Sequence, residues 1–214
     1  MSAVFLDLDG TLMDSRPGII SSLKKTFVEI GRADLAETDL TWMIGPRFDE
    51  SFRAVGIEDV PAATDVYRKY YDGGSIFEAS VFAGVPEMMD ALRAAGHRLY
   101  LATAKPLIAA ERITAHFGLS QRMIREFGPE ADGTRSWKGD LLAYALEVTG
   151  EEARGSIMVG DRSHDVEAAK SVGMASIAVE WGYGGSEDWA GADRVISKPH
   201  ELPEAIAALE GDRG

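Results

Sequence analysis

Two aspartates lie two residues apart near the amino-terminal end of the chain. The apolar run Val4-Phe5-Leu6 continues into Asp7-Leu8-Asp9 and breaks at Gly10. In an extended strand, residues i and i+2 point to the same side, so Asp7 and Asp9 can converge at the carboxyl end of the strand. Two converging carboxylates repel one another and are costly to desolvate, which calls for a cation or a proton. We therefore expect a chemical site here.

Further polar residues follow two later apolar segments. Thr103 comes directly after the strand expected over residues 98–102, and Gly160-Asp161 follow the one over 156–159. In open parallel sheets, functional residues collect beyond the carboxyl ends of the strands, so these side chains should meet at one edge. The full set expected there, including the one lysine between residues 105 and 160, is Asp7, Asp9, Thr103, Lys138, Asp161 and Asp165.

This set of residue types is suited to phosphoryl transfer. Carboxylates hold a hard divalent cation such as Mg²⁺, which prefers oxygen ligands. The Thr103 hydroxyl, the Lys138 ammonium and the amides that open the helix behind Pro106 would bind an anion such as phosphate. We therefore expect Mg²⁺ as the cofactor and a small phosphorylated metabolite as the partner.

The composition excludes several other classes of function. The net charge is −13, which argues against binding of nucleic-acid polymers or anionic membranes, because both favour basic patches. The absence of cysteine excludes disulfides, thiolate nucleophiles and cysteine-based metal sites. The chain opens on its first strand without a signal-peptide pattern, and no apolar stretch is long enough to span a bilayer. We expect a cytoplasmic protein, either a monomer or a homodimer.

The pattern of helices and strands explains how the polar residues are brought together. From Val85 onward, apolar strands alternate with amphipathic helices, which predicts a parallel sheet covered by helices on both faces. Residues 15–81 instead show helical segments without a convincing strand, most clearly at 40–44, 48–55 and 62–71. The expected fold class is α/β, a doubly wound, Rossmann-like sheet with an inserted helical cap domain. The catalytic core would comprise residues 1–14 and 82–214, and the cap residues 15–81.

The polar motifs together resemble those of the haloacid dehalogenase-like phosphohydrolases. The four motifs of that superfamily match, in order, Asp7-Leu8-Asp9-Gly10-Thr11, Thr103, Lys138 and Gly160-Asp161-Arg162-Ser163-His164-Asp165. The helical segment lies where the superfamily carries its helical cap. The resemblance implies a sheet in the order 3-2-1-4-5, with the cap inserted after the first strand.

The resemblance also implies a role for each motif residue. Asp7 would be the nucleophile that forms an aspartyl-phosphate, and Asp9 would protonate the leaving oxygen and then activate water. Ala104 stands where many relatives have serine, which removes one optional hydrogen bond. The implied phosphate-binding residues are Gly10, Thr103, Ala104 and Lys138. The implied Mg²⁺ ligands are Asp7, Asp9 through its backbone carbonyl, Asp161 and, directly or in support, Asp165.

Alternative explanations exist for single motif residues. Thr103 could cap the helix that follows it, Asp165 could cap or solvate its own helix, and Lys138 could be a surface lysine. The four motifs in order outweigh these explanations. Asp9 argues against a dehalogenase, because those relatives lack the second aspartate. A catalytically idle, phosphate-binding regulatory module is the least favoured alternative.

Secondary motifs narrow the resemblance to the phosphoglycolate phosphatase-like and 5′-nucleotidase-like members. These motifs are Ile44-Gly45-Pro46, Asp132-Gly133-Thr134-Arg135 and Trp181-Gly182-Tyr183-Gly184. We interpret the glycines after Trp181 as a turn, since no dinucleotide-binding pattern surrounds them.

Substrate preference is expected to depend on the cap. The candidate specificity residues are Ile44, Gly45 and Arg47. An anionic second end, as in phosphoglycolate, would favour a cationic contact such as Arg47. A nucleobase would instead favour stacking on Trp42, Phe48 or Tyr71, although Trp42 and Phe48 are also expected to pack within the cap. We place a phosphoglycolate-like substrate first and nucleoside monophosphates second.

Overall fold

The computed structural model describes residues 1–45 and 48–211. The chain forms two compact units, one made of Met1–Met13 with Val81–Gly214 and the other of Asp14–Ser80. The two connections between these units contain the short strands β2 (Met13–Asp14) and β3 (Ser80–Val81), which pair with each other. The second unit is therefore an insertion into the first.

The first unit is built on a six-stranded parallel sheet in the order β5-β4-β1-β6-β7-β8. If the strands of this sheet are numbered 1 to 6 in chain order, the order is 3-2-1-4-5-6. This is the predicted order 3-2-1-4-5 with β8 added at the edge. The predicted α/β fold class is therefore confirmed. The strands are β1 (Ala3–Leu6), β4 (Arg98–Ala102), β5 (Arg125–Phe127), β6 (Ser156–Gly160), β7 (Ala175–Val179) and β8 (Arg194–Ile196).

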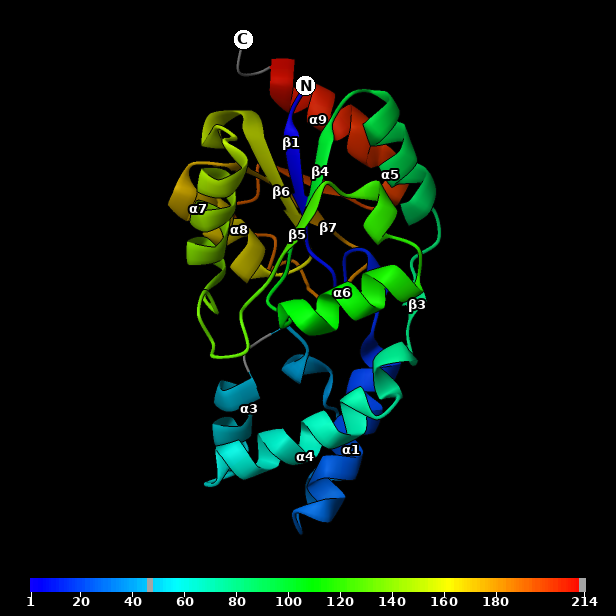
Figure 1. Ribbon diagram of the computed structural model, residues 1–214, viewed down its shortest axis with the longest axis vertical. Coiled ribbons are helices and arrows are strands. Elements are labelled where there is room, and N and C mark those ends of the chain that lie inside the picture. The colour runs from blue at the N-terminus through cyan, green and yellow to red at the C-terminus, as the bar shows by residue number, and fades with distance from the viewer. Residues whose placement is uncertain (46–47, 212–214) are drawn as a thin grey trace. The chain divides into compact units, whose positions relative to one another are not determined.

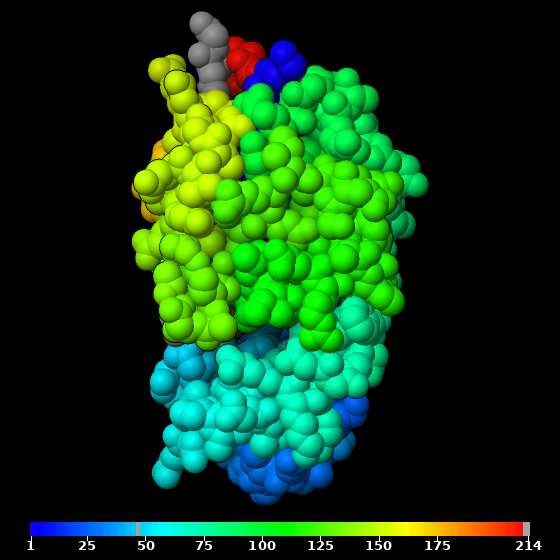
Figure 2. All heavy atoms as spheres, in the orientation of Figure 1, coloured from blue at the N-terminus to red at the C-terminus, as the bar shows by residue number. Residues whose placement is uncertain are grey.

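Helices cover both faces of the sheet (Figure 1), with α7 and α8 on one side and α5 and α9 on the other. Alternate residues of a strand point to opposite faces of the sheet. Ala3 and Phe5 of β1 therefore share one face, where they pack with α7 and α8 in one buried cluster. In this cluster Phe5 stacks on Tyr100, with ring centroids 4.9 Å apart. On the face seen in Figure 2, side chains from α5 to α7 form most of the surface of this unit. The helices are α5 (Val85–Ala94), α6 (Leu107–His116), α7 (Lys138–Thr149), α8 (Ser163–Val172) and α9 (Leu202–Gly211), with 3-10 turns η3 (Ser120–Arg122), η4 (Ala153–Gly155) and η5 (Pro199–Glu201).

The inserted unit is helical, as expected. Its helices are α1 (Arg16–Glu29), α2 (Ala33–Ala36), α3 (Phe48–Ala54) and α4 (Val60–Asp72), with 3-10 turns η1 (Thr41–Met43) and η2 (Ser75–Phe77). The helix predicted over residues 40–44 is thus only the turn η1, because the backbone is already extended at Ile44.

Aromatic side chains form the core of the inserted unit. The ring centroids of Phe48 and Tyr67 are 4.4 Å apart, and those of Tyr67 and Tyr71 are 5.4 Å apart. Phe48 packs within this unit, as predicted, beside the fully buried Phe52. The prediction that Trp42 packs in this core is wrong, since 43% of Trp42 is exposed.

Among residues 1–45 and 48–211, we find no helix with both the length and the apolar character needed to cross a membrane.

Candidate active site

The first aspartate is held at the end of the central strand. Asp7 follows β1, and its N–H donates to the carbonyl of Val159 on β6 at 2.9 Å. The chain then turns sharply, and the Leu8 carbonyl accepts the N–H groups of Leu12 and Met13 at 3.0 Å each. This turn needs the positive φ of Gly10, +85°, and a Cβ there would lie 2.3 Å from Asp161 Oδ2. Glycine therefore allows the backbone to approach Asp161 closely.

Three buried carboxyl groups meet next to this turn. Asp161 follows β6, Asp165 lies in the first turn of α8, and each offers an oxygen within 4.8 Å of the other and of Asp7. Burial raises the pKa of Asp7 to about 7, against the lowering effect of Lys138. Burial, followed by the charges of Asp165 and Asp7, raises the pKa of Asp161 to about 8. Bringing these charges together is costly unless a cation accompanies them.

One cation of the chain itself enters this cluster. Lys138 opens α7, and its Nζ lies 2.6 Å from Asp7 Oδ1 and also contacts Asp165 Oδ1. Burial lowers the pKa of Lys138, but the charges and hydrogen bonds of Asp165 and Asp7 outweigh burial and raise it overall. The ammonium is therefore charged and placed directly beside the Asp7 carboxylate.

The donor set fits a hard divalent cation. Asp161 Oδ2 accepts the N–H groups of Tyr183 at 2.7 Å and Gly184 at 3.3 Å. Asp161 Oδ1, in contrast, is buried and has no hydrogen-bond partner within the described ranges 1–45 and 48–211. A buried carboxylate oxygen without a donor, beside two further carboxylates, is the arrangement that an oxygen-preferring metal ion would satisfy.

The second aspartate and the threonine belong to a neighbouring group of side chains. Asp9 Oδ2 lies 3.0 Å from Nζ of Lys105. Thr103 follows β4, is buried, and accepts the N–H of Lys105 on its hydroxyl at 3.2 Å. Ala104 lies exposed between these two buried residues and offers only its backbone to a ligand. The structure thus adds Lys105, which sequence reasoning missed, to the predicted set.

A comparison with known proteins identifies the family. Residues 4–179 match the model of the haloacid dehalogenase-like hydrolase family. The chain belongs to the haloacid dehalogenase-like hydrolases. The membership predicted from the four motifs is confirmed.

Three relatives of this chain have names that refer to different activities. It is 42% identical to "Tyrosine-protein kinase PtkA" of Mycobacterium tuberculosis over 183 residues, which are 85% of this chain and 62% of that protein. It is 38% identical to a 5′-nucleotidase of Pseudomonas aeruginosa over 190 residues, which are 86% of this chain and 85% of that protein. It is 30% identical to a plasmid-encoded phosphoglycolate phosphatase of Cupriavidus necator over 216 residues, which are 96% of this chain and 93% of that protein.

A solved structure extends the similarity to both units of the hydrolase. The crystal structure of a predicted phosphatase from Clostridium acetobutylicum superimposes with a TM-score of 0.90 and 32% sequence identity. The match covers 97% of this chain and 98% of that one. This chain therefore shares its fold with that protein over nearly the whole length of both chains.

The segment that follows β7 in this hydrolase is more than the turn we predicted. The indole Nε1 of Trp181 donates to the carbonyl of Thr11 at 2.9 Å, and a Cβ on Gly182 would lie 2.4 Å from both Asp161 Cβ and the Gly10 carbonyl. Together with the Tyr183 amide, this segment fixes the Asp161 carboxylate against the turn after β1. The glycines of Trp181-Gly182-Tyr183-Gly184 indicate that the backbone approaches another group closely, but the sequence does not show that this group is Asp161.

We expect Gly182→Ala to weaken Mg²⁺ binding by about 10- to 100-fold, the range typical when groups that orient metal ligands are disturbed. The added methyl group must displace Asp161 or the turn at Gly10, since the gap is only 2.4 Å. Calorimetric titration with Mg²⁺ measures this directly. Gly185→Ala is the matched control, because a Cβ there has nothing within 4 Å. Equal Mg²⁺ affinity in both variants would contradict this account of the segment.

The predicted specificity residues of the inserted unit lie in different environments. Ile44 is buried, with 1% of its surface exposed, and Gly45 is exposed with a φ of +104°. Arg47 lies outside the described residues. The structure leaves the substrate role of all three as a prediction.

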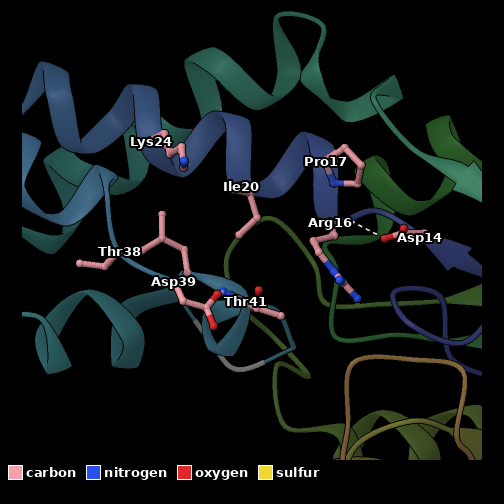
Figure 3. Close-up of a pocket in the computed structure, with 9 residues that line it drawn as sticks. Asp14, Arg16, Pro17, Ile20, Lys24, Thr38, Asp39 and Thr41 are labelled. Carbon is pink, nitrogen blue, oxygen red and sulfur yellow. Dashed lines mark hydrogen bonds between the residues drawn. The ribbon is translucent and has the colours of Figure 1, made fainter.

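The inserted unit also contains a cavity that sequence reasoning missed. Its volume is about 370 Å³, and Figure 3 shows Arg16, Ile20 and Lys24 of α1 on one side and the Thr38–Thr41 segment on the other. The Asp39 carboxylate accepts the N–H of Thr41 at 2.9 Å, while Arg16 and Lys24 are exposed. The cavity combines two cations, Arg16 and Lys24, and two carboxylates, Asp14 and Asp39, with an apolar wall formed by Ile20 and Leu40.

Proposed function

We propose that this hydrolase is a Mg²⁺-dependent phosphatase of small phosphomonoesters that works through an aspartyl-phosphate on Asp7. The observation that supports the proposal most strongly is the 2.6 Å contact between Asp7 Oδ1 and the Lys138 ammonium, beside Asp161 and Asp165. An anionic phosphoryl group and an anionic nucleophile repel each other, so attack requires positive charge at the same place. Lys138 supplies one such charge. Mg²⁺, held by Asp7, the Asp9 carbonyl, Asp161 and Asp165, would supply the other.

In the first step, an oxygen of Asp7 attacks phosphorus and the bond from phosphorus to the leaving oxygen breaks. Asp9 gives its proton to that oxygen, so the product leaves as an alcohol. In the second step, Asp9 takes a proton from water, the oxygen of that water attacks phosphorus, and the bond to Asp7 breaks. The Thr103 hydroxyl, the Lys138 ammonium and the backbone at Gly10 and Ala104 hold the phosphoryl oxygens throughout.

We assign residues 1–14 and 82–214 to the catalytic core and residues 15–81 to a cap that recognises the leaving group. A leaving group with an anionic end would find a cationic contact in Arg16 or Lys24, which are exposed at the cavity of the inserted unit beside the carboxylates of Asp14 and Asp39. Phosphoglycolate has such an end, and 30% identity to a phosphoglycolate phosphatase supports the same class. We also propose that Arg47, Ile44 or Gly45 contacts the anionic end of the leaving group.

Nucleoside 5′-monophosphates are the second candidate substrates. The 5′-nucleotidase relative is 38% identical, which exceeds the 30% of the phosphoglycolate phosphatase. Trp42 is 43% exposed and offers an indole face on which a base could stack. Phe48 and Tyr71, the other aromatic residues considered for stacking, pack in the core of the inserted unit instead.

A panel of phosphomonoesters, ranked by kcat/KM with saturating Mg²⁺ and again in EDTA, tests the proposal. We expect Mg²⁺-dependent phosphate release, with kcat/KM for 2-phosphoglycolate at least about 10-fold above that for nucleoside monophosphates, a difference of about 1.4 kcal/mol in transition-state binding. The reverse ranking would favour the second candidate. Absence of phosphate release from every ester would contradict the phosphatase assignment, as would transfer of phosphate from ATP to protein tyrosine as the sole activity.

A further inference from the structure

We propose that Lys105 is a positioning residue for Asp9, and that its ammonium fixes the carboxyl group that exchanges a proton with the leaving oxygen. This inference rests on the proposed phosphatase function. The observation behind it is the 3.0 Å ion pair between Lys105 Nζ and Asp9 Oδ2, in which the lysine side chain is only 7% exposed and the aspartate side chain 14%.

The backbone around Lys105 is held firmly between β4 and α6. The Lys105 N–H donates to the Thr103 hydroxyl at 3.2 Å, and the Leu107 N–H donates to the Pro129 carbonyl at 3.0 Å. A Cβ on Gly128 would lie 2.6 Å from the Lys105 carbonyl, so the two segments approach to a distance that only glycine permits. An ammonium that extends from such a fixed segment has a defined position.

The carboxyl group of Asp9 needs a partner that sets its orientation. The Asp9 backbone is fixed by its bridge to Met13, and the Gly10 N–H donates to the Met13 carbonyl at 2.9 Å. The last torsion of an aspartate side chain is nevertheless broad, so a fixed backbone does not orient the carboxyl plane. An ammonium that holds Oδ2 sets that plane, and thereby the position of the oxygen that exchanges the proton.

The two buried lysines of the site divide between the two aspartates of the first motif. Lys138 binds the proposed nucleophile Asp7, together with Asp165, and Lys105 binds the proposed proton carrier Asp9. A buried ion pair is a weak source of stability, because the desolvation of both charges offsets most of their attraction. Orientation of Asp9 explains the pair better than stabilisation of the fold does.

A misplaced Asp9 has a consequence that depends on the leaving group. In the first step, proton transfer from Asp9 accompanies cleavage of the bond between phosphorus and the leaving oxygen. Phenolate is basic and leaves slowly without that proton, whereas p-nitrophenolate is a stabilised anion that can leave without it. Because kcat/KM reports on steps up to the first irreversible one, it isolates this effect from the later hydrolysis of the aspartyl-phosphate.

The test compares phenyl phosphate with p-nitrophenyl phosphate, two substrates of similar shape, in wild type and variants. We expect Lys105→Met to lower kcat/KM for phenyl phosphate about 10- to 100-fold, part of the 10²- to 10⁴-fold effect that a positioned proton donor supplies. The loss with p-nitrophenyl phosphate should be at least about 10-fold smaller. Lys105→Arg keeps a cation next to Asp9 and should recover part of the phenyl phosphate activity. Lys170→Met, an exposed lysine at the end of α8, is the matched control and should change neither value.

Several outcomes would overturn this role of Lys105. Equal losses on both substrates would indicate a merely structural role, and a higher KM confined to 2-phosphoglycolate would make Lys105 a substrate contact. In the Asp9→Asn background, Lys105→Met should cause no further loss, so additive losses would also contradict it. If Lys105→Met does not fold, Lys105→Gln carries the same comparison. Failure of the wild type to hydrolyse any phosphomonoester would instead overturn the proposed function, and this inference with it.

Discussion

Replacement of Asp7 by asparagine is expected to lower kcat for p-nitrophenyl phosphate by about 10⁴-fold or more, the scale of loss when a covalent nucleophile is removed. The asparagine amide has nearly the shape of the carboxyl group, but it carries no charge and is a poor nucleophile. The Lys138 ammonium also remains in place through its contact with Asp165. The rate of p-nitrophenolate release at saturating Mg²⁺ measures the effect, and Asp140→Asn, an exposed residue on α7, is the matched control.

The same substitution should leave the metal-free protein folded. Burial raises the pKa of Asp7 to about 7, so the folded protein gives up this proton less readily than the unfolded chain does. Ionisation of Asp7 therefore costs stability, and the cost grows as pH rises from about 4 to about 7 and persists above it. In EDTA at pH 8, Asp7→Asn should unfold at a temperature no lower than wild type. More than a few per cent of wild-type turnover in this folded variant would contradict the role of Asp7 as nucleophile.

Local patterns in the sequence were sufficient to predict most of the sheet and much of the site. The strand over Arg98–Ala102 occurs with the predicted bounds, and the strand expected over residues 156–159 is only one residue longer, because each is a short apolar run that ends at a clear break. The convergence of Asp7 and Asp161 follows from parallel topology, since the carboxyl ends of neighbouring strands meet at one edge. Such features depend on period and strand order, and both leave a signature in the sequence.

Features that depend on the direction of single side chains were not predictable in this way. The role of Lys105 is one such feature, because no local pattern in the sequence shows that its ammonium reaches Asp9. The segment after β7 was interpreted only as a turn, although Trp181 reaches the carbonyl of Thr11, 170 positions away in the chain. The exposure of Trp42 is not predictable for the same reason, since helical periodicity gives no information about side chains in a 3-10 turn.

Asp9→Asn should separate the two chemical steps. With p-nitrophenyl phosphate, whose leaving group needs little protonation, Asp7 can still be phosphorylated, because Asp7, Lys138 and the carboxylates of Asp161 and Asp165 are unchanged. The asparagine amide cannot take a proton from water, so hydrolysis of the aspartyl-phosphate should slow by about 10³-fold, within the range of a lost general base. The intermediate should therefore accumulate.

Rapid-mixing kinetics would detect this as a burst of p-nitrophenolate close to one equivalent per protein, followed by slow turnover. Asp7→Asn should give neither the burst nor the turnover, and Asp140→Asn should behave as wild type. Binding of a phosphate mimic such as vanadate should stay within about threefold in Asp9→Asn, since the groups proposed to hold the phosphoryl oxygens are untouched. Turnover of Asp9→Asn near the wild-type rate would contradict the role of Asp9 in proton transfer. Loss of the burst together with weaker vanadate binding would mean that Asp9 contributes to phosphate binding instead. A burst with intact vanadate binding requires that the neighbouring aspartates have different roles, Asp7 as the nucleophile and Asp9 as the proton carrier.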